Sequence, residues 1–171
     1  METDISWTYR PMQLEDVPNL LDWYNDPDLH VTANAKPFQS YTLKELTDYW
    51  KDKLGRPKYR YYAILSGNKL IGRVGLKPIR GTASVEYSVM IGESVLHSRG
   101  LGTEITRKMI EETFEDPLIE SVYLTVREDN KRAIRCYEKC GFRYLGSFVE
   151  NGVTMLEMSV TRMDVPWAKA N

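Results

Sequence analysis

The chain has 171 residues and a mass of 19.8 kDa, and its 23 Lys and Arg residues nearly balance its 24 Asp and Glu residues, giving a net charge of −1. With 42% apolar and 27% charged residues, the composition is that of a globular protein and excludes a disordered one. Because domains average about 150 residues, we expect one domain over residues 1–171, with a poorly ordered tail at 164–171. The near-zero charge argues against a nucleic-acid partner, since phosphate binding needs an excess of basic residues.

Membrane and metal partners are also not expected. No stretch approaches the roughly 20 apolar residues that span a bilayer, and Met1–Arg10 has no apolar run of the signal-peptide kind. We therefore expect a cytoplasmic protein. The two cysteines, Cys136 and Cys140, are too few for a disulfide framework, and His30 and His97 lie far from them in sequence. We expect both cysteines to be buried helix residues, and no metal site.

The first half of the chain reads as a short strand, two helices and a three-strand meander. Thr42 and Glu45 form a capping-box pattern that begins the second helix, and Gly67-Asn68 is a hairpin turn signal. Between the two helices we expect only a loop, to Ser40. The expected elements are a strand at Ile5–Arg10, helices at Asp16–Tyr24 and Thr42–Leu54, and strands at Tyr59–Leu65, Leu70–Leu76 and Ser84–Ile91.

The second half reads as helix, strand, helix and a final hairpin. The apolar spacing of Leu101, Ile105 and Met109 predicts a buried helical stripe. The strands on either side of this helix form a strand–helix–strand unit, so we expect them to be parallel. The expected elements are helices at Arg99–Glu115 and Asn130–Gly141, with strands at Val122–Val126, Phe142–Val149 and Val153–Val160.

A glycine pair follows the strand Ser84–Ile91, in the segment His97-Ser98-Arg99-Gly100-Leu101-Gly102-Thr103. Glycines let the backbone approach a ligand, and the free N–H groups of a helix N-terminus attract anions. A pyrophosphate cradle is one interpretation, and a strand-to-helix turn that merely needs glycines is the other. No Walker lysine follows, and Ile105 stands where a dinucleotide fingerprint has Gly or Ala.

A second segment, Asn130–Phe142, combines a helix cap with a tyrosine. Asn130 can cap the helix, and Ala133 and Tyr137 lie four residues apart, so both project from one face. From the residues alone, the phenol of Tyr137 either packs in the core or donates a proton in a cleft between the two parallel strands.

Together, these two segments resemble the GNAT superfamily of acyl-CoA N-acyltransferases. The first is similar to its motif A and the second, Asn-x-x-Ala-x-x-x-Tyr-x-x-x-Gly-Phe, to its motif B. The closest resemblance within the superfamily is to aminoglycoside 6'-N-acetyltransferases, followed by ribosomal-protein N-terminal acetyltransferases. The resemblance implies an α+β GNAT fold, in which helices flank both faces of a mixed, mostly antiparallel sheet. It also implies acetyl-CoA as co-substrate. His97 departs from the family's Gln or Arg at the start of motif A.

The resemblance also implies roles for individual residues. The main chain of Val89, Met90 and Ile91 would pair with the pantetheine arm, and N–H groups from His97 to Thr103 would hold the pyrophosphate. Asn130 would bind the pantetheine, Ala133 would leave room for it, and Tyr137 would protonate the departing thiolate. The implied cofactor-binding residues are Val89, Met90, Ile91, His97, Ser98, Arg99, Gly100, Leu101, Gly102, Thr103, Asn130, Ala133 and Tyr137.

The reaction also needs a group that accepts a proton from the attacking amine, because amines with a pKa near 10 are mostly protonated at pH 7. Glu86 is the candidate base and a substrate-binding residue, since it shares a strand face with Ser88 and Met90. The alternative is an exposed strand residue bonded to a neighbour.

The acceptor is expected to be a small-molecule primary amine, cationic or aminoglycoside-like. Pro11–His30 carries five acidic residues and no Lys or Arg, and Trp23 and Tyr24 stand among them, which would suit a cation. The alternative is a capped helix with aromatic residues in the core. A protein N-terminal or lysine acetyltransferase and a non-catalytic CoA-binding sensor remain the rival functions. A homodimer is possible through the last hairpin, at Val153, Met155, Leu156 and Met158.

Overall fold

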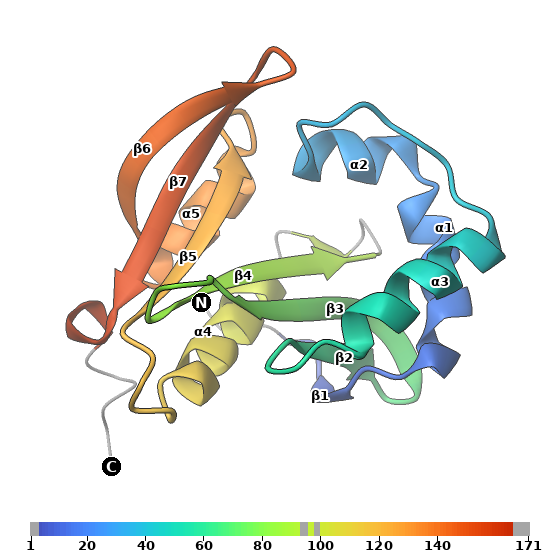
Figure 1. The fold of residues 1–171 in the computed structure, drawn as a ribbon, viewed down its shortest axis with the longest axis horizontal. Coiled ribbons are helices and arrows are strands. Elements are labelled where there is room, and N and C mark those ends of the chain that lie inside the picture. The colour runs from blue at the N-terminus through green and yellow to red at the C-terminus, as the bar shows by residue number, and fades with distance from the viewer. Residues whose placement is uncertain (1–3, 93–95, 98–99, 166–171) are drawn as a thin grey trace.

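The computed structural model describes residues 4–92, 96–97 and 100–165, and it has one seven-stranded sheet in the order β1-β2-β3-β4-β5-β7-β6 (Figure 1). Every described strand pair is antiparallel except β4 with β5, which is parallel. The predicted mixed, mostly antiparallel sheet is therefore confirmed. The strands are β1 (Thr8–Pro11), β2 (Arg60–Ser66), β3 (Lys69–Pro78), β4 (Ser84–Ile91), β5 (Ser121–Arg127), β6 (Arg143–Glu150) and β7 (Val153–Thr161).

Helices cover both faces of this sheet, and each face has its own apolar core. On one face Ile105, Met109 and Ile134 pack against strand residues such as Val122. On the other face Leu20, Leu46 and Trp50 enclose Tyr61. The helices are η1 (Leu14–Asp16), α1 (Val17–Tyr24), α2 (Pro27–Ala33), α3 (Leu43–Leu54), α4 (Leu101–Thr113), α5 (Lys131–Lys139) and η3 (Arg162–Asp164). No helix in the described ranges is long and apolar enough to cross a bilayer.

The structure corrects the prediction of an unbroken loop up to Ser40. That stretch contains the seven-residue helix α2, which Asp26 caps by accepting hydrogen bonds from the N–H groups of Asp28 and Leu29. Pro27 occupies its first position, where a missing N–H costs nothing. The helix has only seven residues and none of them is buried, so it shows no apolar stripe from which the sequence could have predicted it. In the fold α2 lies near the carboxyl end of β5 (Figure 1).

Three boundaries also differ from the predictions. The first strand begins at Thr8 rather than Ile5. Asp164 belongs to η3 and Val165 is fully buried, so the packed part of the chain continues into the expected tail; residues 166–171 lie outside the described ranges. The outer strand of the last hairpin is β6, which exposes apolar side chains, whereas Met155 and Met158 face the core. A homodimer stays a prediction, and β6 is its available edge.

Candidate functional site

A cleft opens where the two parallel strands separate. β4 and β5 pair only from Ser84 with Ser121 to Glu86 with Tyr123, and beyond this point β5 pairs only with β7 (Figure 1). The edge of β4 from Tyr87 to Ile91 is therefore left without a strand partner on this side. A cavity of about 490 Å³ lies along it, and Val89, Met90 and Ile91 line the cavity as predicted. An extended ligand can bind a free strand edge of this kind through main-chain hydrogen bonds.

The glycine segment brings the start of α4 to the same cavity. Gly100 has a φ of 80°, a left-handed conformation that favours glycine, and no described side chain caps the helix there. The first-turn N–H groups of Leu101, Gly102 and Thr103 are thus free to bind an anion. Gly100, Gly102 and Thr103 line the cavity, whereas Leu101 is fully buried in the core. Ser98 and Arg99 lie outside the described residues.

His97 also lines the cavity, and its ring Nε2 is 2.9 Å from the carbonyl oxygen of Ile91. This contact ties the segment before α4 to the end of β4. Burial lowers the pKa of His97, and the nearby Arg132 lowers it as well, while the contact with Ile91 raises it. The side chain is therefore neutral at pH 7, so the motif's first residue acts as a neutral hydrogen-bonding group rather than as a cation.

Four basic side chains line the cavity on the α4–α5 side, and the motif analysis missed them. We call them the basic wall. Three of them lie at i, i+3 and i+7 on α5, which is the spacing of a single helix face, and this spacing was the signal in the sequence. The members of the basic wall are Arg107, Arg132, Arg135 and Lys139. Together with the start of α4 they give this end of the cavity a strong attraction for phosphate groups.

Tyr137 projects from α5 into the cavity, and its ring packs edge-on against Phe142. The hydroxyl has no hydrogen-bond partner among the described residues. Burial raises the pKa of Tyr137 above its ordinary value, and the neighbouring Cys136 and Cys140 add to this effect. The phenol is therefore protonated and free to donate. Cys140 is buried as expected, but Cys136 is only partly buried and lines the cavity.

Asn130 and Ala133 both line the cavity as predicted, and Asn130 has two contacts of its own. Its side-chain oxygen accepts a hydrogen bond from the Ala133 N–H and so caps α5, while its Nδ2 donates to the Thr32 carbonyl at 3.1 Å. Arg127 likewise donates to the Asn34 carbonyl at 2.9 Å. The carboxyl end of α2 is thus held across the cleft by Arg127 at the end of β5 and by Asn130 at the start of α5.

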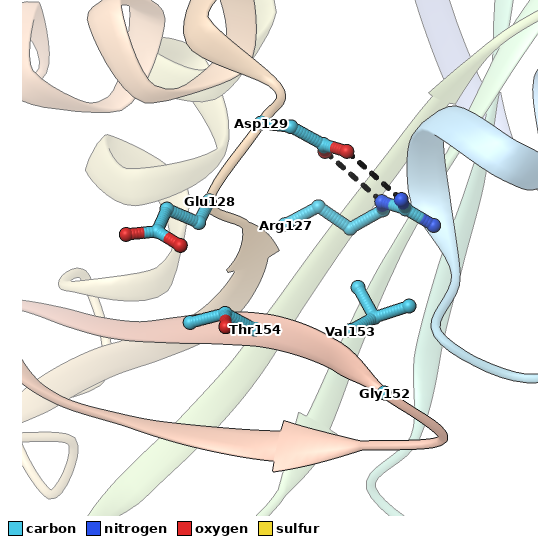
Figure 2. A pocket seen from close by; sticks show the side chains of 6 residues that line it. All are labelled: Arg127, Glu128, Asp129, Gly152, Val153 and Thr154. Carbon is cyan, nitrogen blue, oxygen red and sulfur yellow. Dashed lines mark hydrogen bonds and ion pairs between the residues drawn. The ribbon is translucent and has the colours of Figure 1, made fainter.

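Arg127 is itself fixed by a two-pronged ion pair with Asp129, with hydrogen bonds of 3.0 and 2.9 Å (Figure 2). A small hollow of about 160 Å³ lies beside this pair and is bounded by the turn between β6 and β7. Glu128 and Thr154 also line this hollow, and Arg127 lines both it and the larger cavity. The charge of Arg127 is therefore largely neutralised where it lies.

The candidate base Glu86 lines the cavity and forms an ion pair with Lys77, with Nζ and Oε1 3.7 Å apart. It is the last β4 residue that pairs with β5, at the point where the strands part. Its strand partner Tyr123 donates a hydrogen bond of 2.8 Å to Glu157 on β7. Burial, followed by the Glu157 and Glu86 charges, raises the pKa of Tyr123. Glu157 was not found from the sequence, because strand pairing alone brings it here.

The two aromatic residues predicted to bind the acceptor lie behind the cavity wall. The indole of Trp23 packs directly on Gly92, where even a Cβ atom would approach within 1.7 Å. The hydroxyl of Tyr24 accepts a hydrogen bond of 3.0 Å from Arg73 on β3, and it is Arg73 that lines the cavity. Acceptor binding by Trp23 and Tyr24 stays a prediction, and any such effect of Tyr24 acts through Arg73.

The acidic residues of Pro11–His30 are not lining residues of the cavity. Asp16 accepts two hydrogen bonds from the Arg10 guanidinium, at 2.8 and 2.7 Å, and Asp26 caps α2. The carboxylates of Asp16 and Asp26 therefore stabilise local structure, which agrees with a structural role and not with acceptor binding. The acidic residues of Pro11–His30 therefore place no carboxylate in the cavity, and among the described residues Glu86 is the one that does.

Comparison with known proteins gives a family and a fold. The profile of the acetyltransferase (GNAT) domain matches residues 7–143. A kanamycin resistance protein of Rhizobium radiobacter is 43% identical over 49 residues, which are 29% of this chain and 45% of that protein. The N-alpha-acetyltransferase RimI of Mycobacterium tuberculosis is 32% identical over 96 residues, 55% of this chain and 58% of that protein. The chain thus spans about half the length of these curated relatives.

Among solved structures, AAC(6')-Ib in complex with ribostamycin and coenzyme A superimposes with a TM-score of 0.80. The match covers 93% of this chain and 95% of that one at 23% sequence identity, so it shows the fold alone. These comparisons confirm the resemblance drawn from the two motifs, and they confirm the fold expected from it.

Proposed function

The chain belongs to the acetyltransferase (GNAT) domain family, and on that premise we propose that it is an acetyl-CoA-dependent N-acetyltransferase. In this proposal a primary amine of a small molecule attacks the thioester directly, with no covalent enzyme intermediate. The observation that carries the proposal is the cavity between β4 and β5, which joins a free strand edge, an uncapped helix start and the basic wall. Those three features match the pantetheine arm and the phosphate groups of one ligand.

The pantetheine arm and the phosphate groups of acetyl-CoA each have partners of suitable chemistry in the cavity. The unpaired main chain of Val89–Ile91 would bind the pantetheine amides, and the N–H groups at the start of α4 would bind the diphosphate. Arg132 and Arg135 would neutralise the phosphate charges. One N–H of the Asn130 Nδ2 group already donates a hydrogen bond to the Thr32 carbonyl on α2. The second N–H of the same group would donate to the pantetheine arm.

The proton transfers are assigned to Glu86 and Tyr137. Glu86, which forms an ion pair with Lys77, would accept the proton that the amine loses, directly or through water. Tyr137 would donate its proton to the departing thiolate. Burial raises the pKa of Tyr137. The same surroundings disfavour a charged thiolate, so the pKa of the departing thiol is raised as well.

A thiol-release assay with DTNB and acetyl-CoA, run across amine classes, tests this proposal. We expect release of CoA in the presence of at least one small amine. Stabilisation by CoA without thiol release from any amine would instead identify a CoA-binding sensor. Faster turnover of a peptide panel than of small amines would favour a protein acetyltransferase. The cationic and aminoglycoside-like acceptors expected from the sequence are represented by spermidine and kanamycin.

A further inference from the structure

Arg73 is a charged residue of the cavity that the proposed reaction leaves unused. It projects from β3 and is partly buried. No carboxylate pairs with it among the described residues, whereas Arg127, the other arginine at the α2 end of the cavity, is paired with Asp129. An unpaired cation beside a binding cavity costs free energy unless the ligand brings the opposite charge.

The guanidinium of Arg73 is held in one orientation by protein groups behind it. Its Nε donates to the Tyr24 hydroxyl at 3.0 Å and its Nη1 to the Ser88 hydroxyl at 3.3 Å. Its central carbon stands 5.4 Å from the centre of the Trp50 ring and 5.9 Å from that of Tyr24. The remaining Nη2 has no described partner. An arginine fixed in this way is ready to form a two-pronged contact with a carboxylate.

Arg73 lies on the face of the sheet opposite to α4, whose start forms the phosphate end of the cavity. Its contacts, Tyr24 and Trp50, come from α1 and α3, which cover one face of the sheet, whereas α4 packs on the opposite face. Opposite Arg73 in the strand register stands Met90, and Arg73 binds Ser88, so the guanidinium lies on the face of β4 that also carries Glu86. Ser88 and Glu86 are two residues apart on that face, or about 7 Å.

We infer that Arg73 binds a carboxylate of the acceptor, and that the acceptor class is amino acids rather than polyamines or other polycations. This inference rests on the proposed N-acetyltransferase function. In the bound acceptor the carboxylate contacts Arg73 beside Ser88, and the amine lies a few ångströms away, towards Glu86 and the thioester. A polycation would instead place positive charge against Arg73.

The test compares each L-amino acid with its own amide in the thiol-release assay. The amide has the less basic amine, so more of it is deprotonated at neutral pH, and a preference for the acid cannot come from amine ionisation. We expect kcat/KM to be at least about tenfold higher for the preferred amino acid than for its amide, and higher than for spermidine or kanamycin. An amide or polycation turned over as well as every amino acid would overturn the inference.

Two variants test whether the guanidinium of Arg73 causes the preference for the amino acid over its amide. Arg73→Gln should raise the KM for the amino acid by about tenfold or more, leave the KM for acetyl-CoA unchanged, and bring the acid-to-amide ratio close to one. The matched control is Arg56→Gln, because Arg56 also stacks on a tyrosine, Tyr59, but lies outside the cavity. An unchanged ratio in Arg73→Gln would overturn the inference.

The two proposals fail in different ways. Thiol release from amides or spermidine but from no amino acid would overturn the carboxylate site and leave the N-acetyltransferase intact. No thiol release with any amine would overturn the N-acetyltransferase and this inference together. The comparison of acid with amide in the unaltered protein stands even if Arg73→Gln does not fold.

Discussion

The two sides of the cavity are built in different ways. On the α4–α5 side the ligand-facing groups come from two continuous segments, the start of α4 and one face of α5, so spacing in the sequence fixes their arrangement. On the other side, which we call the acceptor wall, Leu29 and Thr32 come from α2 and Arg73 from β3. Only packing brings these segments together. Under the proposed function, cofactor binding would therefore depend on local sequence and acceptor choice on the tertiary structure.

The largest effect is expected on the α5 side, from Tyr137→Phe. Removing a general acid usually lowers the rate by about 10²- to 10⁴-fold, and we expect kcat to fall at least tenfold with the KM for acetyl-CoA little changed. Steady-state kinetics checks this. The control is Tyr62→Phe, which removes a phenol that packs against Tyr9 outside the cavity. An unaltered kcat would remove Tyr137 from the role of acid.

Behind the acceptor wall the corresponding test is structural, through Gly92→Ala. The added methyl group would meet the Trp23 indole at 1.7 Å, so α1 must move away from the end of β4. Overpacking of this kind typically costs about 1–3 kcal/mol, which denaturant unfolding measures. Gly146→Ala is the control, because its nearest contact is 3.4 Å away. Equal stability of the two variants would show that Trp23 does not pack tightly on Gly92.

Neutralising part of the basic wall should weaken cofactor binding without changing acceptor choice. We expect Arg132→Gln combined with Arg135→Gln to raise the KM for acetyl-CoA by about tenfold, since charge-assisted hydrogen bonds are lost. The acid-to-amide ratio should stay the same. Lys51→Gln, on the exposed surface of α3, is the control. A change in acceptor preference with no change in the KM for acetyl-CoA would show that the basic wall binds the acceptor. It would then contradict the assignment of the basic wall to the cofactor.

The smallest effect concerns His97 and pH. Because burial lowers its pKa in the folded protein, the unfolded chain takes up a proton first as the pH falls below about 6.5. The stabilising contribution of neutral His97 is therefore complete above that pH and is lost as the pH falls toward the folded-state pKa. The unfolding free energy of the cofactor-free protein should decline less between pH 7 and 5 in His97→Asn. Parallel pH profiles would contradict this.

The same contrast explains what could be predicted from the sequence. Gly100, Asn130 and Tyr137 belong to motifs with fixed spacing, and the structure brings all three to one cavity. Arg73 gave no signal because its partner Tyr24 lies on α1, far away in the chain, and Glu157 gave none because strand pairing alone places it beside Tyr123. The helix α2 was missed because its seven residues span only about two turns, too few to show an apolar period. Two acids of Pro11–His30, Asp16 and Asp26, form an ion pair and a helix cap, so these two carboxylates do not support the acceptor prediction.

The most direct test of the account is the position of bound coenzyme A. In a crystal structure of the complex we expect the diphosphate on the N–H groups of Leu101–Thr103 and the pantetheine arm alongside Val89–Ile91, between β4 and β5. Density for the diphosphate at any other place on the protein would contradict the account, as would a pantetheine arm that leaves the β4 edge unpaired.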